Sequence, residues 1–284
     1  MEFFEEILHH LGHPFLETLK MVPILFLAYL FMEWLEHASS DKLTAFVKSS
    51  RSVGPALGSI LGLIPQCGFS GAIAGMYAAG TVTVGTLLAV ILSTSDEMLP
   101  MMVSARLSVS FILFVLGLKL VVGVVTGFTA DGILRLQHRE QDEHIHEFCE
   151  QENCSCKDGV WLSAIKHTLK IALIIFIISV ILHMIVELVP REALISALNF
   201  PVLSQLVASL FGLIPSCAVS VTLTQLYIDG VLGVGPLLCG LLTNGGVGLL
   251  VLYRVNRNLR TNLIITLTVF LVGLTAGSLV GIFF

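Results

Sequence analysis

The chain has 284 residues, of which 55% are hydrophobic and only 12% charged, and its mean hydropathy is +0.92. Soluble domains carry about 25% charged residues, so this composition excludes a large soluble domain and predicts an all-α protein that crosses a membrane many times. The formal net charge of −5 resides in residues 131–158, where three bases and eight acids give 3 − 8 = −5, so it is no sign of nucleic-acid binding.

The chain begins with a segment, residues 1–14, that predicts a short amphipathic helix on the membrane surface. Phe3, Ile7 and Leu11 lie on one face of this helix, and Pro14 ends it. The acidic first residues are unlike the basic start of a signal peptide, so we expect no cleavage. Residues 15–37 are then long enough to span the bilayer.

The next apolar segments differ in length and continuity. Two pieces, 54–65 and 68–80, are each too short for an upright span, and runs of 10–14 residues are often broken or re-entrant. Segment 83–104 is interrupted at 95–100, whereas 107–129 is a clean span. After an acidic loop over residues 131–160, the same series returns as 161–189, 203–216, 217–229, 233–252 and 261–284.

The two series are copies of each other. The stretch GLIPQCGFS at residues 62–70 returns as GLIPSCAVS at residues 212–220, an offset of 220 − 70 = 150. We therefore predict two transmembrane repeats, 15–130 and 161–284, with five segments each. Matched helix breaks in the two halves of a membrane protein point to a substrate site, so the pattern indicates a transporter.

The relative orientation of the repeats depends on residues 54–80. Two passes, or a re-entrant hairpin, give an odd number of crossings per half and inverted repeats, whereas one kinked span gives parallel repeats. The inverted arrangement places ten Lys and Arg side chains on one side of the membrane and three on the other, against eight and five for the parallel one. The stronger bias favours inverted repeats in the plasma or inner membrane, with both termini outside and the acidic loop in the cytoplasm.

The first pair of breaks supplies candidate ligands near the middle of the membrane. Inverted repeats would bring Gln66, Cys67 and Ser70 to face Ser216, Cys217 and Ser220. Thiols prefer soft metals or arsenic(III) species, while amide and hydroxyl oxygens suit harder cations. The alternative is that proline only kinks the helix and small residues only allow close packing. The coincidence of break, cysteine and repeat favours a site.

The second pair of breaks adds further polar groups within apolar segments. These are Ser95, Asp96, Glu97 and Met98 in the first half and Thr243 and Asn244 in the second. Asp96, Met98 and Asn244 offer carboxylate, thioether and amide ligands, a set that could hold Mn²⁺ with some waters retained. Glu97 could instead carry a proton that couples to export. The alternative places this acidic pair near the outer surface, solvated beside Arg106.

Glutamate and histidine recur four residues apart in the first span of each half. Glu33 and His37 share a helix face, and the repeat places His183 and Glu187 at the matching positions. Because histidine titrates near neutrality, these pairs could be gates or proton carriers. Interfacial side chains that reach for the membrane surface explain them nearly as well.

The central loop carries a cluster of imidazoles and thiols, namely His144, His146, Cys149, Cys154 and Cys156. Such groups suit Zn²⁺ or Cu⁺ and predict a metal-collecting role, although their spacing matches no standard zinc finger and a hydrated acidic linker would look similar. No Gly-x4-Gly-Lys-Ser/Thr phosphate loop is present, so ATP-driven pumping by this chain is not expected. We expect no cofactor beyond the transported ion and a coupling proton.

The motifs GLIPQCGFSG, STSDEMLP, GLIPSCAVS and LTNGG occur over ten apolar segments with a His- and Cys-rich central loop. In this the chain resembles the ten-span heavy-metal exporters, whose members are labelled arsenic efflux proteins or manganese transporters. The resemblance covers essentially the whole chain and implies export of a metal or metalloid. It brings no ligand set, so the residues above rest on the repeat alone.

The leading interpretation is a secondary-active exporter of a divalent metal, Mn²⁺ first, that rocks one repeat against the other with proton coupling. The alternatives are arsenite or organoarsenical efflux through the paired cysteines, a Na⁺-coupled anion or carboxylate carrier with its ligand at residues 243–246, and a membrane metal sensor that uses the central loop. An intramembrane enzyme would need a nucleophile and base, and no such motif is recognisable. The expected partners are the lipid bilayer and the ion, and the sequence leaves the oligomeric state open, a homodimer included.

Overall fold

The fold comes from a computed structural model, which describes residues 53–65, 68–96, 98–136, 201–256 and 258–283. Single positions between 19 and 30 and between 165 and 180 are also described, and all of these are helical. Every regular element in the described ranges is an α-helix, which confirms the all-α prediction. In chain order the helices are Val53–Gly62, α3 (Gly68–Ala78), α4 (Val84–Ser93), α5 (Met98–Ser104), α6 (Val109–Leu136), α10 (Pro201–Gly212), α11 (Cys217–Ile228), α12 (Val234–Thr243), α13 (Val247–Val255) and α14 (Leu259–Phe283).

The internal repeat is visible in the helix boundaries. A shift of 150 residues carries the start of α4 to the start of α12 (84 + 150 = 234) and the start of α6 to the start of α14 (109 + 150 = 259). The same shift places α3 on α11 and α5 on α13 to within one residue at the start of each helix, and it places Val53–Gly62 on the last ten residues of α10. The helix order of the second half therefore repeats that of the first.

The helix Val53–Gly62 runs in the same direction as α4. Near its start, a β-carbon added to Gly54 would collide with Thr86 in the first turn of α4. At its end, a β-carbon added to Gly62 would collide with Ser93 in the last turn of α4. Two helices that are in register at both ends are parallel, so their C-terminal ends lie on the same level.

Helix α3 runs in the opposite direction. Its last residue, Ala78, is joined to the start of α4 by residues 79–83. At the other end, Ser95, just after α4, donates a 2.6 Å hydrogen bond to the carbonyl of Leu63, which follows the helix Val53–Gly62 and lies five residues before the start of α3. Helix Val53–Gly62 and α3 therefore form an antiparallel hairpin whose tip contains Pro65. This geometry is a re-entrant or double-pass hairpin and not one kinked span.

The second half shows the same parallel pairing. A β-carbon on Gly235, in the first turn of α12, would lie 3.3 Å from the side-chain nitrogen of Gln205 in α10. At the other end of α12, Thr243 donates a 3.0 Å hydrogen bond to the carbonyl of Ser209 in α10. Helices α10 and α12 are thus parallel, and both end at the level where the breaks begin.

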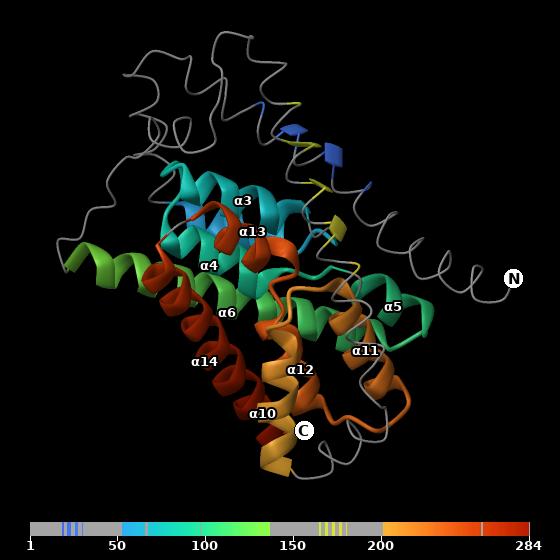
Figure 1. The fold of residues 1–284 in the computed structure, drawn as a ribbon. Helices are drawn as coiled ribbons and strands as arrows, with labels where there is room; N and C mark the ends of the chain where they lie inside the picture. The colour runs from blue at the N-terminus through green and yellow to red at the C-terminus, as the bar shows by residue number, and fades with distance from the viewer. Residues whose placement is uncertain are drawn as a thin grey trace, which may run out of the picture.

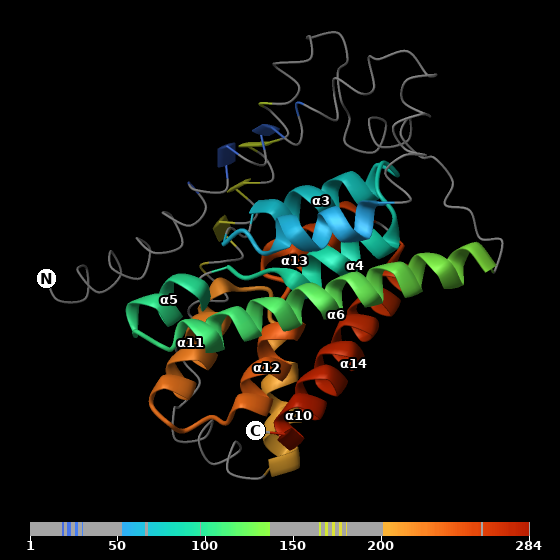
Figure 2. The same ribbon diagram turned by 180° about the vertical axis from the view of Figure 1, so that it is seen from behind.

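The two halves exchange one short helix each. Helix α13 of the second half packs on α3 of the first, and α5 of the first half packs on α11 of the second (Figures 1 and 2). Two apolar cores result: one contains Tyr77 and Leu88 with Val251 and Leu252, and the other contains Met98 with Leu223 and Leu238. The contacts are reciprocal, because α5 and α13 are equivalent in the repeat, as are α3 and α11.

The burial pattern distinguishes central from peripheral helices. Four described stretches are long and apolar enough to cross a membrane: Val84–Ser104, Val109–Leu136, Val234–Val255 and Leu259–Phe283. For each stretch, the buried share of its most apolar part separates two groups. This share is 76% in Val84–Ser104 and 83% in Val234–Val255, but only 28% in α6 and 22% in α14. Large apolar side chains such as Leu113, Val125, Leu263 and Leu271 are exposed along α6 and α14, as a lipid-facing surface requires.

One predicted boundary differs from the structure. The sequence placed the end of the first repeat at residue 130 and counted Asp131 with the acidic loop, but α6 continues to Leu136. Asp131 is buried, with 7% of its surface exposed, and it faces α4. Acidic composition alone could not separate a carboxylate that caps a neighbouring helix from the acids that follow it in the sequence.

Candidate functional site

The candidate site lies where the two halves cross. Because α5 and α13 are exchanged, the connections after α4 and after α12 both lead into the opposite half of the molecule. At this crossing a β-carbon on Gly245 would lie 2.7 Å from Ile91 of α4, and one on Gly248 would lie 2.8 Å from the β-carbon of Ser70 in α3. The absence of side chains at these two glycines lets the backbones of the two halves meet.

The two breaks of the first half are adjacent. The hydroxyl of Ser95 bonds to the carbonyl of Leu63, and the amide of Ser95 donates a 3.1 Å hydrogen bond to the carbonyl of Gly62. Both carbonyls belong to the end of the helix Val53–Gly62, whose last four carbonyls have no partner within the helix. Ser95 therefore closes the end of the first hairpin arm, and its own polar groups are used in doing so.

Thr243 has a similar role in the second half. Its hydroxyl oxygen lies 3.0 Å from the carbonyl oxygens of Ser209, Cys239 and Gly240. A hydroxyl has one proton, so it can satisfy one of these carbonyls at a time. The sequence proposed Ser95 and Thr243 as lining of the pathway; in the structure both hydroxyls donate to main-chain carbonyls.

Two buried polar side chains of the described second half are incompletely satisfied, Thr224 in α11 and Asn244 at the break after α12, and Asn244 is the one at the crossing. It is 2% exposed, and its side-chain oxygen accepts a 3.0 Å hydrogen bond from the amide of Gly246. Its side-chain nitrogen has no hydrogen-bond partner. Gly246 has a φ of 54°, a conformation that L-residues with side chains rarely adopt, and it leads directly into α13. The break thus places a buried amide donor at the start of α13.

Asp96 is buried at the matching break of the first half. It is 3% exposed, which excludes the alternative of a solvated carboxylate near the outer surface. A buried positive charge interacts electrostatically with Asp96: it is Lys119 of α6, which is 1% exposed. The ammonium of Lys119 also donates a hydrogen bond to the carbonyl of Leu241 in the last turn of α12. Lys119 therefore connects α6 with both halves of the site.

One face of α6 explains why Lys119 reaches this point. Asp131 accepts hydrogen bonds from Thr83 (2.7 Å) and from the amide of Gly85 (2.8 Å) at the start of α4. Eight residues earlier on α6, a β-carbon on Gly123 would lie 2.8 Å from the carbonyl of Ala89, in the middle of α4. Because residues four apart share a helix face, the next position toward the N-terminus, Lys119, lies at the C-terminal end of α4.

Four further predicted residues, three from the first pair of breaks and Met98 from the second, take structural positions. Ser216 is the N-cap of α11 and accepts a 3.3 Å hydrogen bond from the amide of Ala218. Ser70 and Ser220 are buried, and Ser70 packs against Gly248. Met98 belongs to the apolar core with α11, so its thioether is surrounded by apolar side chains.

Several predicted residues lie outside the described part of the chain and stay predictions. These are Gln66, Cys67, Glu97, Glu33, His37, His183, Glu187 and the loop residues His144, His146, Cys149, Cys154 and Cys156, together with the side chain of Cys217. Within the described residues, no three side chains of His, Cys, Asp or Glu come together as a metal-binding group would. The described site consists of Asp96, Lys119 and Asn244 among the ends of short helices.

Sequence reasoning gave no role to two of the buried charges. Lys119 is not among the residues that the sequence singled out, and Asp131 was counted with the acidic loop. A signal for Lys119 was present, because it lies in the middle of the apolar segment 107–129, where a charge is expensive. Its partner could not be found from sequence, because Leu241 is 122 residues away in the chain.

Comparison with known proteins gives one match. A family model with the description "Putative, 10TM heavy-metal exporter" matches residues 2–192, which is more than half of the chain. No curated protein and no solved structure matches.

Proposed function

The chain belongs to the family of ten-transmembrane heavy-metal exporters, and we propose that it is a secondary-active exporter of a heavy-metal ion, with Mn²⁺ as the first candidate. The observation that carries the proposal is the burial of Asp96 in a helix break where the two halves cross. A carboxylate in that position is expensive, and such groups in membrane proteins serve ion pathways by default.

The groups around the crossing suit a cation of intermediate hardness. Asp96, three residues after the end of α4, supplies a carboxylate, and Asn244, directly after α12, supplies an amide. The C-terminal ends of α4 and α12 add main-chain carbonyls, whose partial negative charge favours a cation. Oxygen ligands with some waters retained fit Mn²⁺, while Cys67 and Cys217 would add affinity for softer ions.

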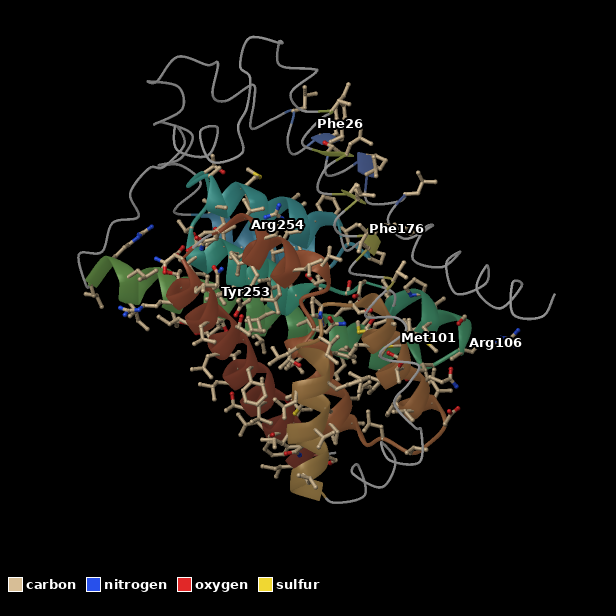
Figure 3. All side chains as sticks on the ribbon, viewed as in Figure 1. Phe26, Met101, Arg106, Phe176, Tyr253 and Arg254 are labelled. Carbon is tan, nitrogen blue, oxygen red and sulfur yellow. The ribbon has the colours of Figure 1, made fainter. Side chains whose placement is uncertain are left out.

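The proposed mechanism is alternating access by inverted repeats. The antiparallel hairpin of the first half, together with the matching parallel pair α10 and α12 of the second, favours an odd number of crossings per half, which would invert the second half relative to the first. Arg106, in the turn after α5, and Arg254, near the end of α13, lie far apart (Figure 3), as expected if the ends of these equivalent helices face opposite sides of the membrane. Rocking of one repeat against the other would then open the crossing to each side in turn.

Proton coupling is part of the proposal. Glu97 and the two Glu/His pairs, Glu33 with His37 and His183 with Glu187, are the candidate carriers. Because histidine titrates near neutral pH and carboxylates within membrane segments commonly serve as proton relays, these residues are suited to exchange protons during transport. The exported ion is the substrate, and no resident cofactor is required.

The test is flux in reconstituted vesicles. Purified protein is inserted into liposomes, and movement of Mn²⁺, Zn²⁺ and arsenite is measured with and without a pH gradient. We expect Mn²⁺ flux that rises with an opposing proton gradient and that is lost in Asp96→Asn. Asp229→Asn is the matched control, because Asp229 is exposed and lies outside the crossing. Flux of arsenite without flux of Mn²⁺ would reject the manganese exporter in favour of arsenite efflux.

A second candidate, a Na⁺-coupled carrier of an anion or carboxylate, is favoured by the unpartnered side-chain nitrogen of Asn244. This donor lies beside the N-terminus of α13, which has no side-chain cap. Amide donors at a helix N-terminus suit an acceptor such as a carboxylate. The same vesicles loaded with a radiolabelled carboxylate distinguish the two: carboxylate flux that needs Na⁺, without any metal flux, would reject the metal exporter.

A further inference from the structure

Three charged side chains are buried among the described residues: Asp96, Lys119 and Asp131. Asp131 is satisfied at the far end of α4 by Thr83 and Gly85. Lys119 is the buried cation that remains beside Asp96, and its ammonium has three donors, of which Leu241 accepts one. The proposed cargo site therefore already contains a positive charge that belongs to the protein.

The position of Lys119 is fixed by packing. Gly123, one turn further along α6, is held against Ala89 of α4 because neither contact surface carries a larger side chain. The ammonium then lies at the C-terminal end of α4 and binds the C-terminal turn of α12, where both helix dipoles favour a cation. The repeat places Val269, an apolar residue, at the equivalent position of the second half (119 + 150 = 269), so one lysine serves both halves.

We propose that Lys119 is a tethered counter-cation of the cargo site, which neutralises Asp96 when no ion is bound and has to move aside when a metal cation binds. The inference rests on the proposed function, because it takes Asp96 as a ligand of the cargo. It assigns to Lys119 the task of keeping cation binding weak enough for release. A buried carboxylate without this neighbour would hold a divalent cation too tightly to be exported efficiently.

This role differs in its consequence from that of a structural anchor. If Lys119 only holds α6 against α12, its removal loosens the site and lowers affinity for the ion. If it competes with the ion, its removal raises affinity, because repulsion of the ion by a nearby unit charge disappears. A gain of affinity is therefore the sign of a counter-cation, and a loss is the sign of an anchor.

The experiment measures binding of Mn²⁺ alone to the purified full chain in detergent by equilibrium dialysis. Lys119→Met removes the charge, and Lys119→Gln removes it while keeping a donor for the carbonyl of Leu241, so that one variant preserves the contact between helices. We expect both to bind Mn²⁺ about tenfold or more tightly than the wild type. In the vesicle assay both should turn over more slowly, because release becomes limiting. Size-exclusion profiles and melting temperatures identify any variant that does not fold.

Three further variants make the result specific. Lys119→Arg keeps the charge and should bind Mn²⁺ with nearly wild-type affinity. Asp131→Asn removes a buried charge at the other end of α4 and should leave affinity unchanged. Combining Asp96→Asn with Lys119→Gln should abolish the gain, because the carboxylate that Lys119 neutralises is then absent.

The outcomes separate the two proposals. Wild-type binding with equal or weaker binding by folded Lys119→Gln would overturn the counter-cation and leave the exporter standing. Binding by Lys119→Gln but not by the wild type would support the counter-cation in its strongest form. If neither protein binds Mn²⁺, both the counter-cation and the manganese site at Asp96 are rejected.

Discussion

The hydroxyl of Thr83 donates a 2.7 Å hydrogen bond to the carboxylate of Asp131, 48 residues later in the chain. The other carboxylate oxygen accepts from the amide of Gly85 at 2.8 Å, so Asp131 caps the N-terminus of α4 from a neighbouring helix. A negative charge at that end of the helix also complements its dipole. Lys119, on the same face of α6, lies at the other end of α4. Helix α6 thus presents an acid and a base to the two ends of a buried helix.

Loss of the carboxylate at position 131 should destabilise the fold without removing ion binding. Asp131→Ala deletes two buried hydrogen bonds to a charged acceptor, each worth about 1.5–3 kcal/mol in proteins. We expect a clearly lower melting temperature in detergent, measured by the loss of the native peak on size exclusion after heating. Asp229→Ala is the control, since Asp229 is exposed and its carboxylate accepts a hydrogen bond from the side chain of Gln225 on the same helix turn. Equal melting temperatures for the two variants would contradict the cap.

Removal of the charge at position 96 should stop export while the protein stays folded. Asp96→Asn keeps the size of the side chain, so packing is little changed, but it removes the anionic ligand. We expect Mn²⁺ flux in vesicles to fall at least about tenfold, on the scale of losing a charged ligand. Wild-type flux in this variant would show that the ion passes elsewhere.

The close approach of the two halves at Gly248 should not tolerate a side chain. A β-carbon there would meet the β-carbon of Ser70 at 2.8 Å, so Gly248→Val should push α13 away from α3 and reduce both stability and flux. Gly117→Val is the matched control, because a β-carbon on Gly117 has no neighbour within 4 Å. Both changes add the same atoms to a helix. The two variants are compared by their melting temperatures and by their Mn²⁺ flux in vesicles. Similar losses in both would point to helix propensity instead of the crossing.

The three membrane-segment cysteines should differ in reactivity. Cys239 is buried against Leu274 and Ser278, at sulfur distances of 3.5 and 3.8 Å, so it should resist a thiol reagent in the folded protein. Cys67 and Cys217 should react from the pathway and be protected by saturating cargo, if they line it. Mass spectrometry of peptides after labelling with N-ethylmaleimide gives the comparison. Rapid labelling of Cys239, or slow labelling of the other two regardless of cargo, would contradict this assignment.

The inverted arrangement makes a prediction about sidedness. Arg106 and Arg254 are exposed and follow or end the equivalent helices α5 and α13, so inverted repeats place them on opposite sides of the membrane, and parallel repeats on the same side. Arg106→Cys and Arg254→Cys are each labelled in intact cells with a membrane-impermeant maleimide. We expect Arg106→Cys to react and Arg254→Cys to react only after the membrane is opened. The same result for both variants in intact cells, whether both react or neither does, would falsify the inversion.

The candidate site shows the limit of reasoning from residue types. Asp96 is buried, and the buried side-chain nitrogen of Asn244 has no hydrogen-bond partner, whereas the hydroxyls of Ser95 and Thr243 bond main-chain carbonyls at helix ends. A hydroxyl can serve a ligand or the backbone equally well, and only the position of the nearest free carbonyl decides between them. The paired cysteines stay a prediction.

The sequence by itself determined the class of protein, the duplication and the positions of the helix breaks. These follow from local properties: apolar length sets what can span a bilayer, proline removes a main-chain donor, and a repeated motif shows itself within the chain. The matching of α4 with α12 and of α6 with α14 needed no knowledge of contacts.

Only the tertiary structure decided that α5 and α13 change places between the halves, that Asp131 caps α4, and that Lys119 reaches across to Leu241. Each of these contacts joins residues that are far apart in the chain, and none produces a periodic sequence pattern in either segment. They depend on which surfaces pack when the halves fold together, and glycine at positions such as 123 and 248 sets the distances at which they meet.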